Sequence, residues 1–319
     1  MTAYLEKFTA WLGQHMFLIV LSALLLGFLT PLSDSPGLRT IVVGAFSYMT
    51  FVTALGTSLK EFLQVLQKPV IPLWILVLIH LISPLLAWLT GLFLFAGSHS
   101  IQLGYLVAAS TPIGVTSVIW TALAGGSVSV ALVAVTLDTL VVPVMLPFFF
   151  KLVIGQALQI DYAQMMFQLL VMITIPSIVG MVIHDYGRKN ILPPSLKITG
   201  NFIAKAAFFI VIFINSALVG PDIAWDLSTL KIVLVTMILV AAGYALGYLG
   251  SFICKKRSQE VALAMIYCVG LRNASFGVVL ALTFFPHAVA IPVTMTMLYQ
   301  QPFAAIIPHL FQQANKAAT

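Results

Sequence analysis

The 319-residue chain carries very little charge: 8% of its residues are charged, whereas soluble domains carry roughly 25%. Hydrophobic residues make up 61%. Nine acidic and fifteen basic side chains are too few to cover a water-exposed surface, which excludes a soluble globular domain, a disordered chain and a nucleic-acid-binding protein with a solvated basic face. The composition is typical of a polytopic membrane protein, so the lipid bilayer is its expected surrounding.

The chain also lacks the signatures of an enzyme. Its two cysteines, Cys254 and Cys268, are too few for a disulfide framework and have no histidine at metal-ligand spacing beside them. A Gly-x-Ser-x-Gly nucleophile motif and a Gly-Lys phosphate-binding loop are both missing. We therefore expect no enzymatic activity, no resident cofactor and no obligatory protein partner.

Long apolar segments are what the sequence does contain. They do not alternate in polarity, so they predict an all-α membrane protein of ten transmembrane helices rather than a β-barrel. The predicted spans are residues 16–32, 41–58, 70–95, 101–124, 128–150, 163–184, 202–219, 229–254, 261–284 and 288–311. We expect the first span to be retained rather than cleaved as a signal peptide, because no small-residue cleavage pattern follows it.

Basic residues indicate the orientation of the predicted bundle. With ten spans both termini share one side, and that side carries most of the positive charge. Its basic residues are Lys7, Lys60, Lys68, Arg188, Lys189, Lys197, Lys255, Lys256, Arg257 and Lys316, whereas the other side has Arg39, Lys151 and Lys231. Because positive loops stay in the cytoplasm, we expect a multi-pass protein of the cell (inner) membrane with both termini cytoplasmic.

The two halves of the chain, residues 1–158 and 159–319, each contain five predicted spans. Five is an odd number, so two similar halves would be inverted relative to each other. The fourth span of each half has glycine and polar residues in its middle, at 109–117 and 268–277. Backbone leaves helical geometry in a membrane only where protein or a watery cavity satisfies it. Both segments are therefore predicted to be broken helices beside a substrate site, with two kinked, closely packed helices as the alternative.

Two ionisable side chains lie deep inside predicted spans: Asp138 in the fifth and Arg272 in the ninth. A lone charge at such a depth costs roughly 2.5–3.5 kcal/mol on insertion scales. We therefore predict that Asp138 and Arg272 pair or share one polar site, with local solvation of each as the alternative. His80 in the third span is interpreted as a packed histidine rather than a ligand.

Four segments, taken in order, resemble the bile acid:sodium symporter family over nearly the whole chain. They are residues 55–62 closing the second span, Pro-Ile-Gly-Val-Thr-Ser at 112–117, residues 124–128 before the fifth span, and Val-Gly-Leu-Arg-Asn at 269–273. The resemblance implies ten helices in two inverted repeats, with broken helices 4 and 9 crossing. It also implies a core domain of spans 3–5 and 8–10, a panel domain of spans 1, 2, 6 and 7, and sodium-coupled uptake of organic anions such as bile salts or pantoate-like acids.

The sequence departs from this family where sodium would bind. The family's span-nine glutamate and glutamine fall on Cys268 and Arg272, and three further ligand positions are the aliphatic residues Val118, Ala131 and Val135. A thiol, a guanidinium and aliphatic side chains do not supply the oxygen ligands that a hard cation needs. We therefore expect Arg272 to replace the bound cation with Asp138 as its counter-ion, and sodium coupling to be weak or absent.

These inferences lead to one function and two alternatives. The leading function is secondary transport of small organic anions by alternating access. The alternatives are sodium-independent or proton-coupled transport of the same anions, with protonation of Asp138 as the coupling step, and a non-transporting membrane anion receptor. The predicted substrate-binding residues are Thr111, Pro112, Gly114, Thr116, Arg272, Asn273 and Ser275; the candidate ion-site residues, for Na⁺ above all, are Ser117, Cys268, Asn273 and Gln300.

Overall fold

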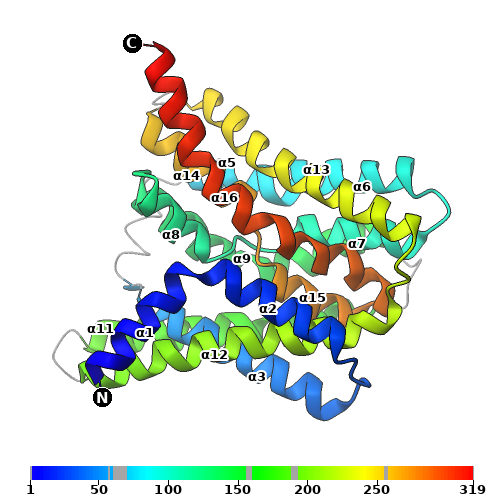
Figure 1. Ribbon diagram of the computed structural model, residues 1–319, viewed down its shortest axis with the longest axis horizontal. Helices are drawn as coiled ribbons and strands as arrows, with labels where there is room; N and C mark the ends of the chain where they lie inside the picture. The colour runs from blue at the N-terminus through cyan, green and yellow to red at the C-terminus, as the bar shows by residue number, and fades with distance from the viewer. Residues whose placement is uncertain are drawn as a thin grey trace. The chain divides into compact units, whose positions relative to one another are not determined.

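The computed structural model describes residues 2–56, 58–59, 70–155, 160–187, 193–254 and 258–318 (Figure 1). Within these ranges the chain is helical, as predicted, and the one β-type pairing joins Ile113 to Arg272. Some of the residues that indicate the orientation and the family resemblance lie outside the described ranges. These are Thr57 and residues 60–62 of the motif at 55–62, and Lys60, Lys68, Arg188, Lys189, Lys255, Lys256 and Arg257.

The helices follow the predicted apolar segments in order. Up to residue 155 they are α1 (Thr2–Gln14), α2 (Met16–Leu29), α3 (Pro36–Ala54), α5 (Val70–Val77), α6 (Ser83–Leu94), α7 (His99–Ser110), α8 (Thr116–Leu123) and α9 (Val128–Ile154). The later ones are α10 (Tyr162–Leu169), α11 (Ile175–Gly187), α12 (Pro194–Val219), α13 (Leu227–Gly250), α14 (Gln259–Gly270), α15 (Ala274–Phe284) and α16 (Ala290–Ala318). Two π-helical turns, η1 (Leu78–Ile82) and η2 (Leu170–Thr174), and three 3₁₀ turns, η3 (Gly220–Asp222), η4 (Ser251–Ile253) and η5 (His287–Val289), complete the set.

Six helical segments in the described part of the chain are long and apolar enough to cross a membrane. They are Pro36–Ala54, Val70–Leu94, Val128–Ile154, Tyr162–Tyr186, Ile198–Asp222 and Leu227–Ile253. The segments Tyr4–Gly13 and Met16–Leu29 meet the same test only as a pair, bent by 77°. The fourth and ninth predicted spans are absent from this set because each is divided into two short helices.

Helix starts outside the apolar runs follow ordinary capping chemistry. The side chains of Ser35, Asp226 and Ser258 each accept a hydrogen bond from the backbone N–H three residues later, at the starts of α3, α13 and α14. Pro36 occupies the first turn of α3, where its missing N–H costs nothing. Such caps matter in a membrane protein because the unpaired N–H groups of the first turn find no water to hydrogen-bond with inside the bilayer.

Contacts within the chain define two compact units, and each is described by itself. The first unit comprises residues 1–67, 139–222 and 283–285. In it α12 packs against α1, α2 and α3, and α11 packs against α3 (Figure 1). Gly27 of α2 permits one of these approaches, since a Cβ there would lie 2.6 Å from the carbonyl oxygen of Phe213 in α12.

The second unit comprises residues 68–138, 223–282 and 286–319. In it α13 packs against α14 and α16, and α6 packs against α7. Helix α9 contributes its residues up to Asp138 to this unit and the rest to the first. Gly247 of α13 lies directly against α14: a Cβ at this position would be 2.6 Å from the carbonyl oxygen of Met265 and 2.8 Å from Cα of Ile266.

We predict that Gly247→Ala destabilises the protein, because the added methyl group forces α13 and α14 apart. Gly44→Ala is the matched control: Gly44 is an exposed glycine inside α3, and nothing lies within 4 Å of the position that its Cβ would take, so alanine there adds helix propensity alone. The midpoint of thermal unfolding in detergent micelles measures both. We expect a fall for Gly247→Ala and an unchanged or raised midpoint for Gly44→Ala; equal midpoints for the two would contradict the close contact.

Candidate functional site at the crossing of two broken helices

The two predicted helix breaks are present, and they lie against each other within the second unit. One separates α7 from α8 and the other separates α14 from α15. The N–H of Gly114 donates to the carbonyl of Leu271 at 2.8 Å, and the N–H of Asn273 donates to the carbonyl of Pro112 at 2.8 Å. Each break therefore satisfies backbone groups that the other leaves free, which is how non-helical backbone is tolerated inside a membrane protein.

The sequence explains why the breaks form here. Pro112 has no N–H and disfavours helical geometry in the residue before it, and Thr111 accordingly has an extended backbone, with φ −62° and ψ 150°. Gly114 lets the two segments approach, because a Cβ there would lie 3.2 Å from the carbonyl oxygen of Arg272. The crossing is thus built from one proline, which ends α7, and one glycine, which admits the facing backbone.

Asp138 of α9 is fully buried, with no exposed surface, and it binds the crossing directly. Its Oδ2 accepts a hydrogen bond from the N–H of Ile113 at 2.5 Å. Its Oδ1 lies 2.5 Å from Nε2 of His80, which is 7% exposed. The carboxylate therefore holds a third backbone donor of the break and pairs with a histidine from the π-helical turn η1.

Arg272 of the second break is 8% exposed and donates through Nη2 to the carbonyl of Ile79 at 2.5 Å and to the carbonyl of Ala109. Ala109 lies in the last turn of α7, where carbonyls have no helical partner. The carbonyl of Ile79 is free for a different reason. The N–H of Ser83 bonds to Leu78, and the next residue, Pro84, has no N–H to donate.

Asp138 and Arg272 were predicted to pair or to share one polar site, and among the described residues they form no direct ion pair. Among the described residues Asp138 has His80 and the N–H of Ile113 as partners, and Arg272 has two carbonyl oxygens. The physical reason is that other partners are available: the first break offers the carboxylate the N–H of Ile113, and the guanidinium binds one free carbonyl at the end of α7 and one in η1. The two charges still interact electrostatically at the same crossing.

His80 is the functional candidate that the sequence interpretation assigned to packing alone. Its position beside Ile79 places the partner of Asp138 and the partner of Arg272 on consecutive residues of η1. A signal for it was available, because a histidine inside a transmembrane segment belongs with the ionisable residues that usually mark a functional site. Which acidic residue it would face could not be read from the sequence.

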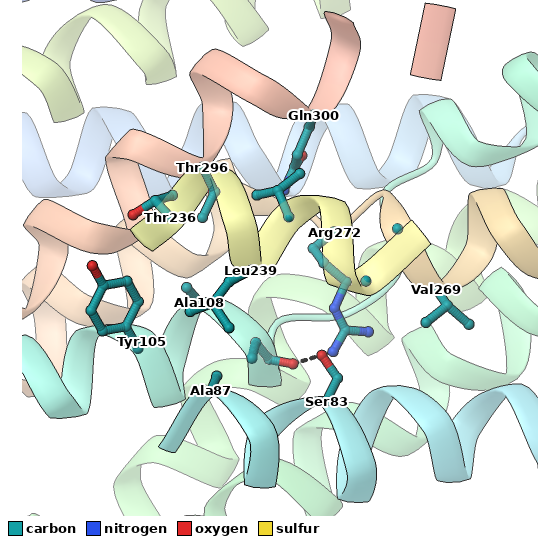
Figure 2. Close-up of a pocket in the computed structure, with 14 residues that line it drawn as sticks. Ser83, Ala87, Tyr105, Ala108, Thr236, Leu239, Val269, Arg272, Thr296 and Gln300 are labelled. Carbon is teal, nitrogen blue, oxygen red and sulfur yellow. Dashed lines mark hydrogen bonds between the residues drawn. The ribbon is translucent and has the colours of Figure 1, made fainter. Parts of the chain in front are cut away.

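A cavity of about 50 Å³ lies beside Arg272. Water-sized sites need about 10–15 Å³ each, so this volume holds roughly three waters or a group the size of a carboxylate. Figure 2 shows the guanidinium of Arg272 extending from the break toward Ser83 of α6. The polar groups lining the cavity, in addition to Arg272, come from Ser83, Tyr105, Thr236, Thr296 and Gln300.

The other predicted substrate-binding residues build the crossing rather than line the cavity. The hydroxyl of Thr111 donates to the carbonyl of Ala108 at 2.9 Å, and the hydroxyl of Thr116 accepts from Nε2 of Gln301 at 3.4 Å. Asn273 caps α15, since its Oδ1 accepts from the N–H of Phe276 at 3.2 Å. Ser275 is buried within α15.

The candidate ion-site residues fall into two places. Ser117 and Cys268 are buried next to each other, where α8 begins and α14 ends. Gln300 lines the cavity instead, and its backbone carbonyl accepts a hydrogen bond from the hydroxyl of Tyr244 at 2.6 Å. Within the described residues no group of three or more His, Cys, Asp or Glu side chains is placed to hold a metal ion.

An apolar helical chain in which two broken helices cross around buried charges has the features of a multi-pass membrane transporter. Residues 43–224 match the sodium bile acid symporter family. The uncharacterised protein YbaS of Bacillus subtilis (strain 168) is 31% identical over 296 residues, which cover 92% of this chain and 94% of YbaS. The chain belongs to the sodium bile acid symporter family, a family of transporters.

A second relative is more distant. It is the probable sodium/metabolite cotransporter BASS2, chloroplastic, of Oryza sativa subsp. japonica, which is 26% identical over 219 residues. The aligned part covers 67% of this chain and half of the rice protein.

We predict that Asp138→Leu lowers the free energy of unfolding by about 1–3 kcal/mol more than Asp138→Asn, because leucine leaves the buried N–H of Ile113 unpaired. Asparagine keeps an acceptor for Ile113 and an amide that can bond to His80. Both variants remove the same negative charge, so their difference isolates the hydrogen bonds. Equilibrium unfolding in mixed SDS and detergent micelles measures it, and equal stability of the two variants would show that the bond to Ile113 contributes nothing.

Proposed function

We propose that the protein is a secondary transporter of small organic anions, and that Arg272 binds the carboxylate or sulfonate of the substrate. The observation that carries this proposal is that two nitrogens of the Arg272 guanidinium are available for a ligand. Its Nε and Nη1 are buried and have no hydrogen-bond partner among the described residues, and the residue lines the cavity. A guanidinium presents its donors as a fork that fits the two oxygens of a carboxylate. Hydroxyl and amide groups around the same cavity provide further contacts.

In this proposal Arg272 also takes the place of a sodium ion. Backbone carbonyls are good ligands for a hard cation, and the free carbonyls of Ile79 and Ala109 are bound by the guanidinium instead. The buried thiol of Cys268 is a soft ligand, which suits a hard cation such as sodium poorly. Transport would therefore need no sodium, although the family name and the name of the rice relative both include sodium.

The same proposal includes the finer architecture: ten spans in two inverted five-helix repeats, with core and panel domains and alternating access. Its support is that interrupted helices occur at the fourth predicted span of each half, α7–α8 and α14–α15. The two breaks also belong to one compact unit, whereas α2, α3 and α10–α12 belong to the other. We further propose insertion in the cell membrane with both termini cytoplasmic, following the distribution of basic residues.

We predict that purified protein in proteoliposomes takes up at least one anion from a labelled panel of pyruvate, pantoate, methanesulfonate and taurocholate. Arg272→Gln is expected to lower this uptake by about 10- to 100-fold, the value of a lost charge-assisted contact. Lys231→Gln is the matched control, because it removes a positive charge from the same unit at a residue bound to the carbonyl of Leu94, away from the cavity.

Uptake that survives in Arg272→Gln, or that falls equally in Lys231→Gln, would overturn the role of Arg272. Uptake of none of the four anions, with each bound by the purified protein, would favour a receptor over a transporter. Thermal unfolding of each variant confirms that it is folded before it is assayed.

We also predict that sodium gives no specific stabilisation. A bound ion raises the free energy of unfolding by RT ln(1 + [L]/Kd), which is about 2.7 kcal/mol at a hundredfold excess over Kd. Thermal unfolding in sodium chloride and in choline chloride, at matched ionic strength and over a range of concentrations, should give the same midpoint. A saturable rise seen with sodium alone would mean that other oxygens form an ion site and that Arg272 does not replace the cation.

A further inference from the structure

The His80–Asp138 pair and the guanidinium of Arg272 contact consecutive residues of the turn η1. His80 contacts Asp138, and the residue before it, Ile79, accepts a hydrogen bond from Arg272. Asp138 in turn holds the N–H of Ile113, which is paired with Arg272 across the two breaks. A change in the charge or position of the pair is therefore transmitted to the guanidinium by two routes, one through η1 and one through the crossing.

The charges at the crossing balance only in certain combinations. With His80 neutral, the negative charge of Asp138 balances the positive charge of Arg272, and the empty site carries no net charge. Binding a monovalent anion adds one negative charge. One proton on the His80–Asp138 pair then restores neutrality. The form that holds the anion without the extra proton carries a net negative charge, and the form that holds the proton without the anion carries a net positive charge. Either charge is costly inside a largely apolar unit.

We propose that the His80–Asp138 pair is the proton-binding site of the transporter, and that one proton enters with each monovalent anion bound at Arg272. This inference rests on the proposed function, since it assumes that an anion binds and moves. A carboxylate can only accept, so Nε2 of His80 carries the hydrogen that it shares with Oδ1 of Asp138. The entering proton binds Nδ1 and gives an imidazolium–carboxylate pair, and it leaves from Nδ1 when the anion is released.

The other titratable groups on elements packed around the pair do not compete for this role. In the described part of the chain they include Arg272, Cys268, Tyr105, Tyr244 and Tyr267. The hydroxyl of Tyr267 donates to the carbonyl of Ala304 at 3.2 Å. Arg272 and Cys268 interact electrostatically with Asp138. The hydroxyls of Tyr105 and Tyr244 donate to backbone carbonyls, at 3.0 Å to Ile232 and at 2.6 Å to Gln300. A guanidinium stays charged and donates only, so the imidazole, with its second ring nitrogen, is the group there that can accept a further proton.

Two measurements on the full chain test the proposal. In the first, each of the four panel anions is added to purified protein in weakly buffered detergent solution with a pH indicator. We expect about one proton to be taken up for each anion bound, with binding measured in parallel by equilibrium dialysis. In the second, proteoliposomes load the anion under an imposed pH gradient, acidic outside, and then under a potassium diffusion potential alone. The pH gradient should drive accumulation, and the potential should not.

His80→Gln removes the proton-binding nitrogen while glutamine can still hydrogen-bond to Asp138. We expect this variant to lose accumulation driven by the pH gradient and to bind the anion without proton uptake. His99→Gln is the matched control: His99 is a histidine of the same unit, near Gln102 at the start of α7, and does not contact the pair. It should keep both properties.

Anion binding without proton uptake in the unmodified protein overturns the proposal, and so does pH-driven accumulation in a folded His80→Gln. Proton uptake by the unmodified protein supports it even if His80→Gln fails to fold. Failure of the underlying function looks different, because then none of the four anions is bound or transported at any pH. Accumulation driven by sodium and insensitive to pH would keep the anion transporter and reject the proton site.

Discussion

The antiparallel backbone bridge between Ile113 and Arg272 is the interaction on which the rest of the site depends. Two hydrogen bonds join the breaks, and they hold in place the other polar groups that each interruption releases. Asp138 can bind the N–H of Ile113 only because that N–H is not used by a helix. Arg272 reaches the carbonyl of Ala109 for the same reason. Buried charges are thus stabilised by backbone groups that the crossing makes available.

The sequence predicted what depends on composition and on local chain geometry. Long apolar runs indicated the helices, and glycine and polar residues inside two of them indicated the breaks at 109–117 and 268–277. The family resemblance was visible in the order and spacing of four short segments, at 55–62, 112–117, 124–128 and 269–273. These features can be predicted without knowing which residues pack nearby. A proline restricts its own backbone, and a long apolar run favours a membrane-spanning helix, wherever it lies in the fold.

What could not be predicted from the sequence was the choice of partners. Asp138 and Arg272 carry opposite charges, and from the chain alone a direct pair was the economical arrangement for both. In the structure Asp138 contacts His80 and the N–H of Ile113, whereas Arg272 contacts two backbone carbonyls. These contacts depend on how separate helices and the two breaks pack together. Pro84 was a partial local sign: in a regular α-helix it leaves the carbonyl of His80 without a donor, and only the π turn moves the free carbonyl to Ile79. A free carbonyl in the sequence does not show which cation it will bind.

The π-helical turn η1 has a consequence for the register of the third span. A π turn contains one residue more than the α-helical turn it replaces, so it acts as a single-residue insertion within Val70–Leu94. If the same residues were wound as a regular α-helix, everything after the turn would be rotated by about 100° relative to its present orientation. His80 and Ser83 would then no longer lie on their present faces. The π winding of this turn therefore sets the face on which His80 meets Asp138.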